Sequence, residues 1–252
     1  MREIIFFSTV PGLSEAFPIL PATKAMPQWM KTAQSKFMEA KENANGMRFS
    51  HITRCPGIVE IMTKGYVVPM WHDVMVETDF RKGPGFGWTV PTSTLAEELM
   101  KEKNLLGTHS SDGVMEFIPR THNQSKIFMK INTPWHIVAP KDVKVLFLPI
   151  SYPDDSMYES TTGILDTKIT TEINVQGWWN LLNGRHLLPA GYPLMQILPL
   201  TDETFKLTVR DANESDQEWL KKRKYFNSFS FGPLKGSLKN IIKNAYIKHF
   251  SS

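Results

Sequence analysis

The sequence predicts a mainly β protein, an antiparallel β-sandwich or jelly roll with two or three peripheral α-helices. Short runs rich in Val, Ile, Phe and Thr alternate with Gly, Pro, Asn and Asp, which is the pattern of strands separated by turns. No helical pattern of crossover length separates the later runs, so a parallel β-α-β sheet is disfavoured. The hydrophobic fraction of 41%, with fifteen Phe and seven Trp, supplies enough side-chain volume for a substantial core.

The first element is a strand in the apolar run that follows Arg2, within the segment MREIIFFSTVPG. This run is too short for the apolar region of a secretory signal, and no small-residue cleavage site follows it. A proline-rich connector over residues 11–27 comes next, and its prolines prevent long regular structure. We therefore expect the connector to lie along the surface of the domain.

Two helices are expected outside the sheets. Pro27 suits the first turn of a helix that ends before Asn45-Gly46, and its apolar face is expected to pack on a sheet. A second helix is expected at about 94–106, where a Ser-Thr pair can cap its start and a glycine follows its last leucines. The apolar face of the first helix comprises Trp29, Met30, Ala33 and Phe37.

Six further runs have a period close to two and are predicted strands. Between the first two of these runs lies the glycine-rich segment RKGPGFG, residues 81–87. Its glycines and two cations can cradle a phosphate through backbone N–H groups, but it lacks the Lys-Ser/Thr ending of a P-loop, so we favour a hairpin loop. The six runs are Tyr66–Glu77, Ile127–Asn132, Val143–Ile150, Ile169–Val175, Pro193–Leu200 and Thr204–Val209.

The net charge of +4 is unevenly distributed along the chain. From Asp216 onward, eight basic and two acidic residues give +6, so the rest of the chain carries −2. We divide the chain into a β-rich domain, residues 1–215, and a basic amphipathic helical segment, residues 216–252, packed on that domain or extending from it. Such a segment can bind a partner subunit, an anionic membrane or nucleic acid, or it can be an ordinary helix with solvated lysines. The basic residues predicted to contact partners are Lys221, Lys222, Arg223, Lys224, Lys239 and Lys243.

Cysteine usage and hydropathy limit the cellular compartments in which we expect the protein. Cys55 is the only cysteine, so neither an intramolecular disulfide nor a thiolate metal cluster can form. Its Cys-Pro-Gly sequence is interpreted as a turn that enters a buried segment. No stretch approaches the roughly 18 consecutive apolar residues of a membrane helix. We expect a protein of a reducing compartment that is neither secreted nor membrane-spanning.

The histidines offer little metal chemistry. Seven are scattered along the chain without the close pairing of a helical or jelly-roll metal site, so no metal and no cofactor are predicted. A triad of two histidines and one carboxylate would make the protein a jelly-roll iron oxygenase, which is the weakest of three functional hypotheses. The residues available for that triad are His72, Asp73 and His136.

One segment resembles the core of the dUTPase and dCTP deaminase superfamily: GILDT, followed by LLPAGYPLMQ after an aromatic insertion. The resemblance implies that Asp166 is a general base for water and that Gln196 lies near a nucleotide. The chain departs from the superfamily at Ile169, where a tyrosine is expected, and it lacks the upstream Arg-Ser motif that contacts phosphate. The alternative role of Asp166 is that of a turn residue after a glycine. The candidate residues are Asp166 for catalysis and Gly163, Gly191 and Gln196 for substrate binding.

A broader resemblance covers most of the chain. Five sequence blocks, in this order and spacing, resemble an uncharacterised family of proteins from tailed bacteriophages and bacteria. The resemblance implies a viral origin and a location in the host cytoplasm or the virion, and it implies no particular activity. The blocks are residues 25–31, 55–74, 132–150, 163–167 and 187–200.

These observations favour a non-enzymatic phage-type assembly or binding module, such as a virion component, that forms a homo-oligomer or binds other phage subunits. Trp178 and Trp179 are expected to be exposed and to anchor such contacts, because aromatic residues dominate interfaces. The pair can equally be half buried, since adjacent strand residues face opposite sides. The alternative function is that of a nucleotide-handling enzyme of dUTPase-like fold in which Asp166 activates water.

Overall fold

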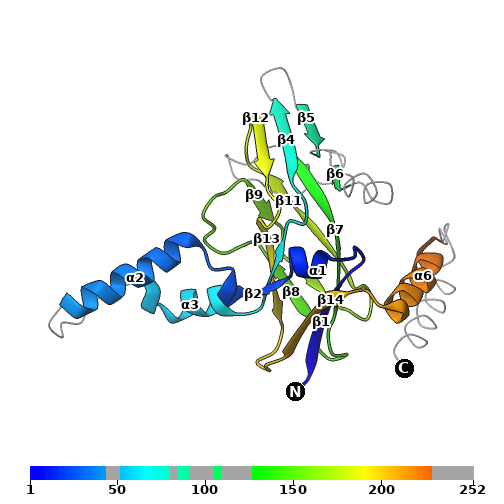
Figure 1. Cartoon of the computed structure of the whole chain (residues 1–252), viewed down its shortest axis with the longest axis horizontal. Coiled ribbons are helices and arrows are strands. Elements are labelled where there is room, and N and C mark those ends of the chain that lie inside the picture. The colour runs from blue at the N-terminus through cyan, green and yellow to red at the C-terminus, as the bar shows by residue number, and fades with distance from the viewer. Residues whose placement is uncertain (44–51, 80–84, 91–104, 109–126, 229–252) are drawn as a thin grey trace.

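A computed structural model of the 252-residue chain describes residues 1–43, 52–79, 85–90, 105–108 and 127–228 (Figure 1). Strands dominate, and they form three sheets. The predicted fold class, a mainly β and sandwich-like architecture with peripheral helices, is confirmed. Among the described helices, none is both long and apolar enough to cross a membrane.

The largest sheet has six strands. Its strand pairs are antiparallel except for β1 and β14, which run parallel although they come from opposite ends of the described chain. The strands in spatial order are β14 (Lys206–Asp211), β1 (Glu3–Ser8), β7 (Phe128–Val138), β11 (Glu172–Trp179) and β9 (Tyr158–Ser160), with β6 (Leu106–Thr108) beside β7.

The other two sheets are antiparallel throughout. The three-stranded sheet stands at the top of Figure 1 and contains the hairpin of β4 and β5. The five-stranded sheet has the order β10 (Gly163–Leu165), β8 (Val145–Leu148), β13 (Pro193–Pro199), β3 (Tyr66–Pro69) and β2 (Leu20–Pro21). The three-stranded sheet has the order β12 (Asn183–Leu188), β4 (Val74–Asp79) and β5 (Gly85–Thr89).

One hydrophobic core joins the sheets. Alternation along β1 directs Ile4 and Phe6 into this core and Phe7 to the opposite face of the six-stranded sheet. The Phe6 ring meets the Tyr66 ring of the five-stranded sheet edge to face, with centroids 5.2 Å apart. The sheets bury their facing sides against one another. This packing is what the alternation of apolar and polar residues along the strands requires.

The helices lie outside the sheets (Figure 1). In the view of Figure 1, α2 and α3 extend to one side, and α6 lies on the other. We call α2, η2 and α3 together the arm. The described helices are α1 (Leu13–Ala16), α2 (Gln28–Asn43), α3 (Pro56–Thr63) and α6 (Glu214–Ser228), with short 3-10 turns η1 (Ala22–Lys24) and η2 (Ile52–Arg54).

The helix expected after Pro27 is confirmed as α2. Of the four residues of its expected apolar face, Met30 is buried and Trp29, Ala33 and Phe37 are half-buried, whereas Met38, outside that face, is 53% exposed. Figure 1 shows the helix axis leading away from the sheets, so the later part of α2 extends beyond them.

Two other local predictions need correction. Cys55 does not begin a turn into a buried segment; it is exposed and precedes α3, in which Pro56 occupies the first helical position. The helix expected at about 94–106 falls largely outside the described residues. Its predicted last residue, Leu106, instead begins β6 and pairs with Ile131, because sheet pairing and burial override the local helical pattern there.

At the C-terminal end, α6 begins at Glu214, close to the boundary that the charge distribution indicated. The rest of the predicted basic amphipathic segment, residues 229–252, lies outside the described residues. The division into residues 1–215 and 216–252 therefore stays a prediction.

Candidate functional site

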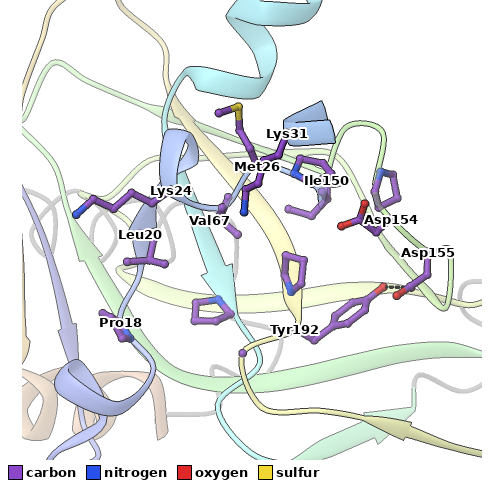
Figure 2. Close-up of a pocket in the computed structure, with 16 residues that line it drawn as sticks. Pro18, Leu20, Lys24, Met26, Lys31, Val67, Ile150, Asp154, Asp155 and Tyr192 are labelled. Atoms are coloured by element: carbon purple, nitrogen blue, oxygen red, sulfur yellow. Dashed lines mark hydrogen bonds between the residues drawn. The ribbon is translucent and has the colours of Figure 1, made fainter. Parts of the chain in front are cut away.

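A cavity of about 340 Å³ lies where the arm joins the sheets (Figure 2). We call it the arm-root pocket. Its walls come from the proline-rich connector, the start of α2, β3, the start of β13 and the loop after β8. Proline rings give it rigid apolar surface without backbone N–H donors. The prolines are Pro18, Pro27, Pro69, Pro153 and Pro193.

The loop after β8 holds the first turn of α2. The Asp154 carboxylate accepts hydrogen bonds from the backbone N–H groups of Gln28 and Trp29, at 2.8 and 3.2 Å. The Trp29 indole N–H donates to the Tyr152 carbonyl at 2.7 Å. The first N–H groups of a helix have no partner within the helix, and an acid there also complements the helix dipole. These contacts fix the direction in which the arm leaves the body.

Tyr152 carries the backbone strain of this loop. Its φ is 53°, and among the described residues it is the one non-glycine with positive φ. A non-glycine residue in the left-handed region costs about 1–2 kcal/mol, so the surrounding contacts must hold it there. The Trp29 hydrogen bond to its carbonyl and the Trp29 ring, edge to face at 6.3 Å, are two such contacts.

Tyr192 closes the floor of the arm-root pocket. Its hydroxyl donates to Asp155 Oδ1 at 2.7 Å, the dashed line in Figure 2. Burial, followed by the hydrogen bond to Asp155, raises the pKa of the Tyr192 phenol far above its usual value. Tyr192 is therefore a neutral donor at physiological pH, and it holds Asp155 in place.

The arm-root pocket is lined by two acids and two lysines. Asp154 and Asp155 lie on one side, Lys24 points away from them on the other, and Lys31 lies between (Figure 2). Both acids already accept hydrogen bonds from the protein, so their role is to organise the loop. Four of the five sequence blocks that carry the phage-family resemblance contribute residues to this pocket, including Met26, Val67 and Ile150.

A second cavity, of about 310 Å³, lies between α6 and the outer face of the six-stranded sheet. We call it the α6 cavity. Its floor is apolar, one wall is the turn that leads into β11, and the facing wall is the start of α6. Its lining residues include Phe7, Val138, Ala139, Lys141, Thr167, Lys168, Thr171, Asp216 and Trp219.

Three neighbouring strands align a polar and aromatic stack beside the α6 cavity. Phe7 on β1 is the Cα partner of Arg210 on β14 and of His136 on β7. The His136 ring stacks on Phe7, with centroids 5.0 Å apart and planes 8° apart, and the Arg210 guanidinium lies 5.6 Å from the Phe7 centroid. His136 is buried, and its Nδ1 lies 3.1 Å from the Thr171 hydroxyl.

Asp216 connects α6 to this stack. Its carboxylate pairs with both terminal nitrogens of Arg210, and it exchanges backbone-to-side-chain hydrogen bonds with Asn213, each at 2.9 Å. The exchange is a capping box at the start of α6. Burial alone would raise the pKa of the Asp216 carboxyl, but hydrogen bonds from Arg210 and Asn213 outweigh burial and lower it. Asp216 is therefore a charged anchor.

The residues of the dUTPase-like hypothesis have different uses in the structure, although Gly163 and Gln196 belong to the same five-stranded sheet. Asp166 ends β10 in a turn, where Oδ1 accepts the backbone N–H of Lys168 at 3.0 Å and its carbonyl accepts that of Ile169 at 2.9 Å. Gly163 lies in the edge strand β10, and Gly191, with φ of 84°, lines the arm-root pocket. Neither of the two cavities includes Asp166 in its lining, so the observed geometry is that of the turn residue.

Gln196 has a structural use. Its side chain is 3% exposed, and Nε2 donates to the carbonyls of Ile61 and Lys64, both at 2.7 Å. These carbonyls belong to the C-terminal end of α3 and to the residue after it, where backbone acceptors lack helical partners. The Gln196 amide thus joins β13 to the arm instead of facing a ligand cavity.

The expectation that Trp178 and Trp179 are exposed is wrong. They are 5% and 0% exposed, because this end of β11 is covered on both faces. Trp178 packs edge to face on Phe128, and Trp179 belongs to the core. Of the basic residues predicted to bind partners, Lys221 and Lys222 are exposed on α6. The side chains of Arg223 and Lys224, and the whole of Lys239 and Lys243, lie outside what the structure describes.

The iron-oxygenase hypothesis is wrong for the described part of the chain. His72 Nδ1 lies 2.8 Å from the Asp73 carbonyl, and the Asp73 carboxylate accepts the N–H of Ala190 at 2.7 Å. His136 stacks on Phe7, on the sheet face turned toward α6. Among the described residues, no group of three His, Cys, Asp or Glu side chains is arranged to hold a metal.

Sequence reasoning missed the residues that organise both cavities. The Asn-x-x-Asp pattern of residues 213–216 is a readable capping signal for α6. No comparable local signal marks Asp154 or Tyr192, since their partners lie far away in the sequence. Comparison with known proteins adds no identification: no family model, curated protein or solved structure matches the chain.

Proposed function

We propose that the protein is a non-enzymatic assembly module of bacteriophage type, and that two copies associate through their arms. The observation that carries the proposal is the arm itself: a helix fixed at its root that extends beyond the sheets with apolar side chains in solvent. Met38 and Ile52 are 53% and 44% exposed. These two exposed apolar side chains on one projecting element give a partner an apolar surface to cover.

A second copy of the chain is the partner that we favour. Two identical arms can bury the same apolar residues against each other around a two-fold axis, which is the commonest symmetry of soluble oligomers. Each arm contributes α2 and α3, so the contact is a cluster of four helices. The rigid root supports this role, because a helix held by Asp154 and Trp29 presents its tip in one direction and loses little entropy on association.

The test is the mass of the full chain in solution, measured by sedimentation velocity over a range of micromolar concentrations. We expect a concentration-dependent dimer that the double variant Met38→Glu, Ile52→Glu weakens by about tenfold or more in Kd. The matched control is Ile164→Glu, because Ile164 is 64% exposed on the edge strand β10 of the five-stranded sheet. A monomer at every concentration, or equal dissociation constants for all three proteins, would contradict the proposal.

The alternative proposal, a nucleotide-handling enzyme that uses Asp166, receives less support from the geometry. The carboxylate of Asp166 accepts a hydrogen bond within its own turn, and the Gln196 amide donates to carbonyls at the C-terminal end of α3. Hydrolysis of deoxynucleoside triphosphates by the wild type, abolished in Asp166→Asn, would establish the enzyme and displace the assembly module as the main function.

A further inference from the structure

We propose that the α6 cavity is a binding site for a small organic oxyanion, a phosphate monoester or carboxylate carried on a single planar apolar group. Four segments build this cavity: the outer face of β1, the end of β7 with the residues after it, the turn before β11, and the start of α6. Its volume of about 310 Å³ lies at the lower end of the range for small-molecule pockets, which limits the ligand to roughly one ring with one anionic group.

The polar half of the α6 cavity favours an anion. Lys141 and Lys168 line it, together with the buried residues Thr167 and Thr171, whose hydroxyls contact the Ala139 carbonyl and His136 Nδ1. The one carboxylate among the lining residues, Asp216, is already paired with Arg210. Charge-assisted hydrogen bonds from ammonium groups are the strong ones for phosphate and carboxylate oxygens.

Neighbouring acids outside the lining are also engaged. Asp142 pairs with the guanidinium of Arg2, and Asp166 accepts the N–H of Lys168. The Lys168 ammonium contributes to holding the pKa of Asp142 low, after the larger effect of Arg2. The lining itself therefore carries two ammonium groups and one carboxylate, and that carboxylate is already paired.

The apolar half of the α6 cavity favours a planar group. Val138 is 39% exposed although it lies on a sheet face beneath a helix. Phe7 and Ala139 continue this apolar floor, and the Trp219 side chain of α6 faces it across the cavity. A ring placed between Val138 and Trp219 would remove both from water, which a bare inorganic anion cannot do.

The experiment is isothermal titration of the full-length protein with four probes: phenyl phosphate, benzoate, benzylamine and inorganic phosphate. We expect saturable binding of phenyl phosphate or benzoate at millimolar or lower concentration, at least about tenfold tighter than inorganic phosphate. Benzylamine has the same ring with a cation, and we expect it not to bind. The ranking of phenyl phosphate against benzoate identifies which oxyanion the site prefers.

Two double variants locate the binding. Lys141→Gln, Lys168→Gln is expected to weaken binding by about tenfold or more, because both ammonium groups are lost. Lys24→Gln, Lys31→Gln makes the same change of charge in the arm-root pocket and should leave Kd unchanged. All four lysines are exposed, so both variants should fold normally. Equal binding of benzylamine, no saturable binding of either ring anion, or equal weakening in both variants would overturn the proposal.

Discussion

The guanidinium of Arg210 makes two hydrogen bonds to the carboxylate of Asp216, and it lies over the ring of Phe7. The Arg210 side chain thus joins β14, an edge strand of the six-stranded sheet, to the first turn of α6. The planar guanidinium suits this arrangement, because it can form a bidentate pair and pack on an aromatic ring at the same time. Placement of α6, and with it one wall of the α6 cavity, depends on this pair.

Replacement of Asp216 should therefore loosen α6. Asp216→Ala removes the paired carboxylate and half of the capping box, and we expect the free energy of unfolding to fall by about 1–3 kcal/mol. Equilibrium urea unfolding at neutral pH measures this change. Glu218→Ala is the matched control, since Glu218 is an exposed acid two residues farther along the same helix. Equal losses in the two variants would show that the Arg210 pair does not anchor α6.

The same carboxylate predicts an acid-dependent loss of stability. The folded pKa of Asp216 is depressed, so its contribution is present above the unfolded pKa of about 4 and is lost as pH falls through the folded pKa. Stability measured from pH 7 down to pH 3 should thus fall more steeply in the wild type than in Asp216→Asn. Parallel curves for the two proteins would contradict this expectation.

Gln196 is expected to stabilise the attachment of α3 to β13. Gln196→Leu keeps a similar volume but leaves the carbonyls of Ile61 and Lys64 without their donor, at a cost of about 1–3 kcal/mol. Thermal and urea unfolding measure this loss. Gln217→Leu, at an exposed position of α6, controls for the chemistry of the substitution and should change stability little.

Two buried tyrosines should respond oppositely to loss of their hydroxyl. Tyr192→Phe removes the donor to Asp155 and should cost about 1 kcal/mol. Tyr158→Phe should be neutral or stabilising, because the buried Tyr158 hydroxyl has no hydrogen-bond partner among the described residues. Urea unfolding of both variants at pH 7 tests the contrast, and a larger loss in Tyr158→Phe would contradict it.

Burial raises the pKa of both phenols in the folded protein. Their contribution to stability is complete below the unfolded pKa of about 10 and is lost as pH rises above it, because the unfolded chain then releases protons that the folded protein retains. Stability measured between pH 8 and pH 11 should therefore fall less steeply in Tyr158→Phe than in the wild type.

Two glycines with left-handed backbones differ in the space around them. A Cβ at Gly65 would lie 2.1 Å from the Ile197 carbonyl oxygen, whereas a Cβ at Gly191 meets only the Phe17 ring at 3.8 Å. Gly191→Ala should thus cost about 1 kcal/mol for its positive φ alone. Gly65→Ala should cost about 3 kcal/mol or more, because the β3–β13 pairing must also shift. Unfolding free energies of the two variants test this order.

Local pattern was sufficient for most of the strands. Alternating apolar residues between turn residues predicted β1, β8, β13 and β14 close to their observed bounds, and Pro27 marked the start of α2. The shortest strands escaped detection, because three-residue strands such as β9 and β10 hold too few positions for a period to be visible. Their existence depends on a neighbouring strand that offers hydrogen bonds.

The sequence by itself determined the fold class, the approximate positions of β1, β8, β13 and β14, the start of α2 and the concentration of basic residues after Asp216. These properties depend on side-chain period, turn residues and composition, which are local. Only the tertiary structure decided that Trp178 and Trp179 are buried, that α2 leaves the sheets, and that Phe7, His136 and Arg210 form one stack. The physical reason is that strand order, register and the direction of a helix are set by contacts between distant segments, and no single segment specifies its partner.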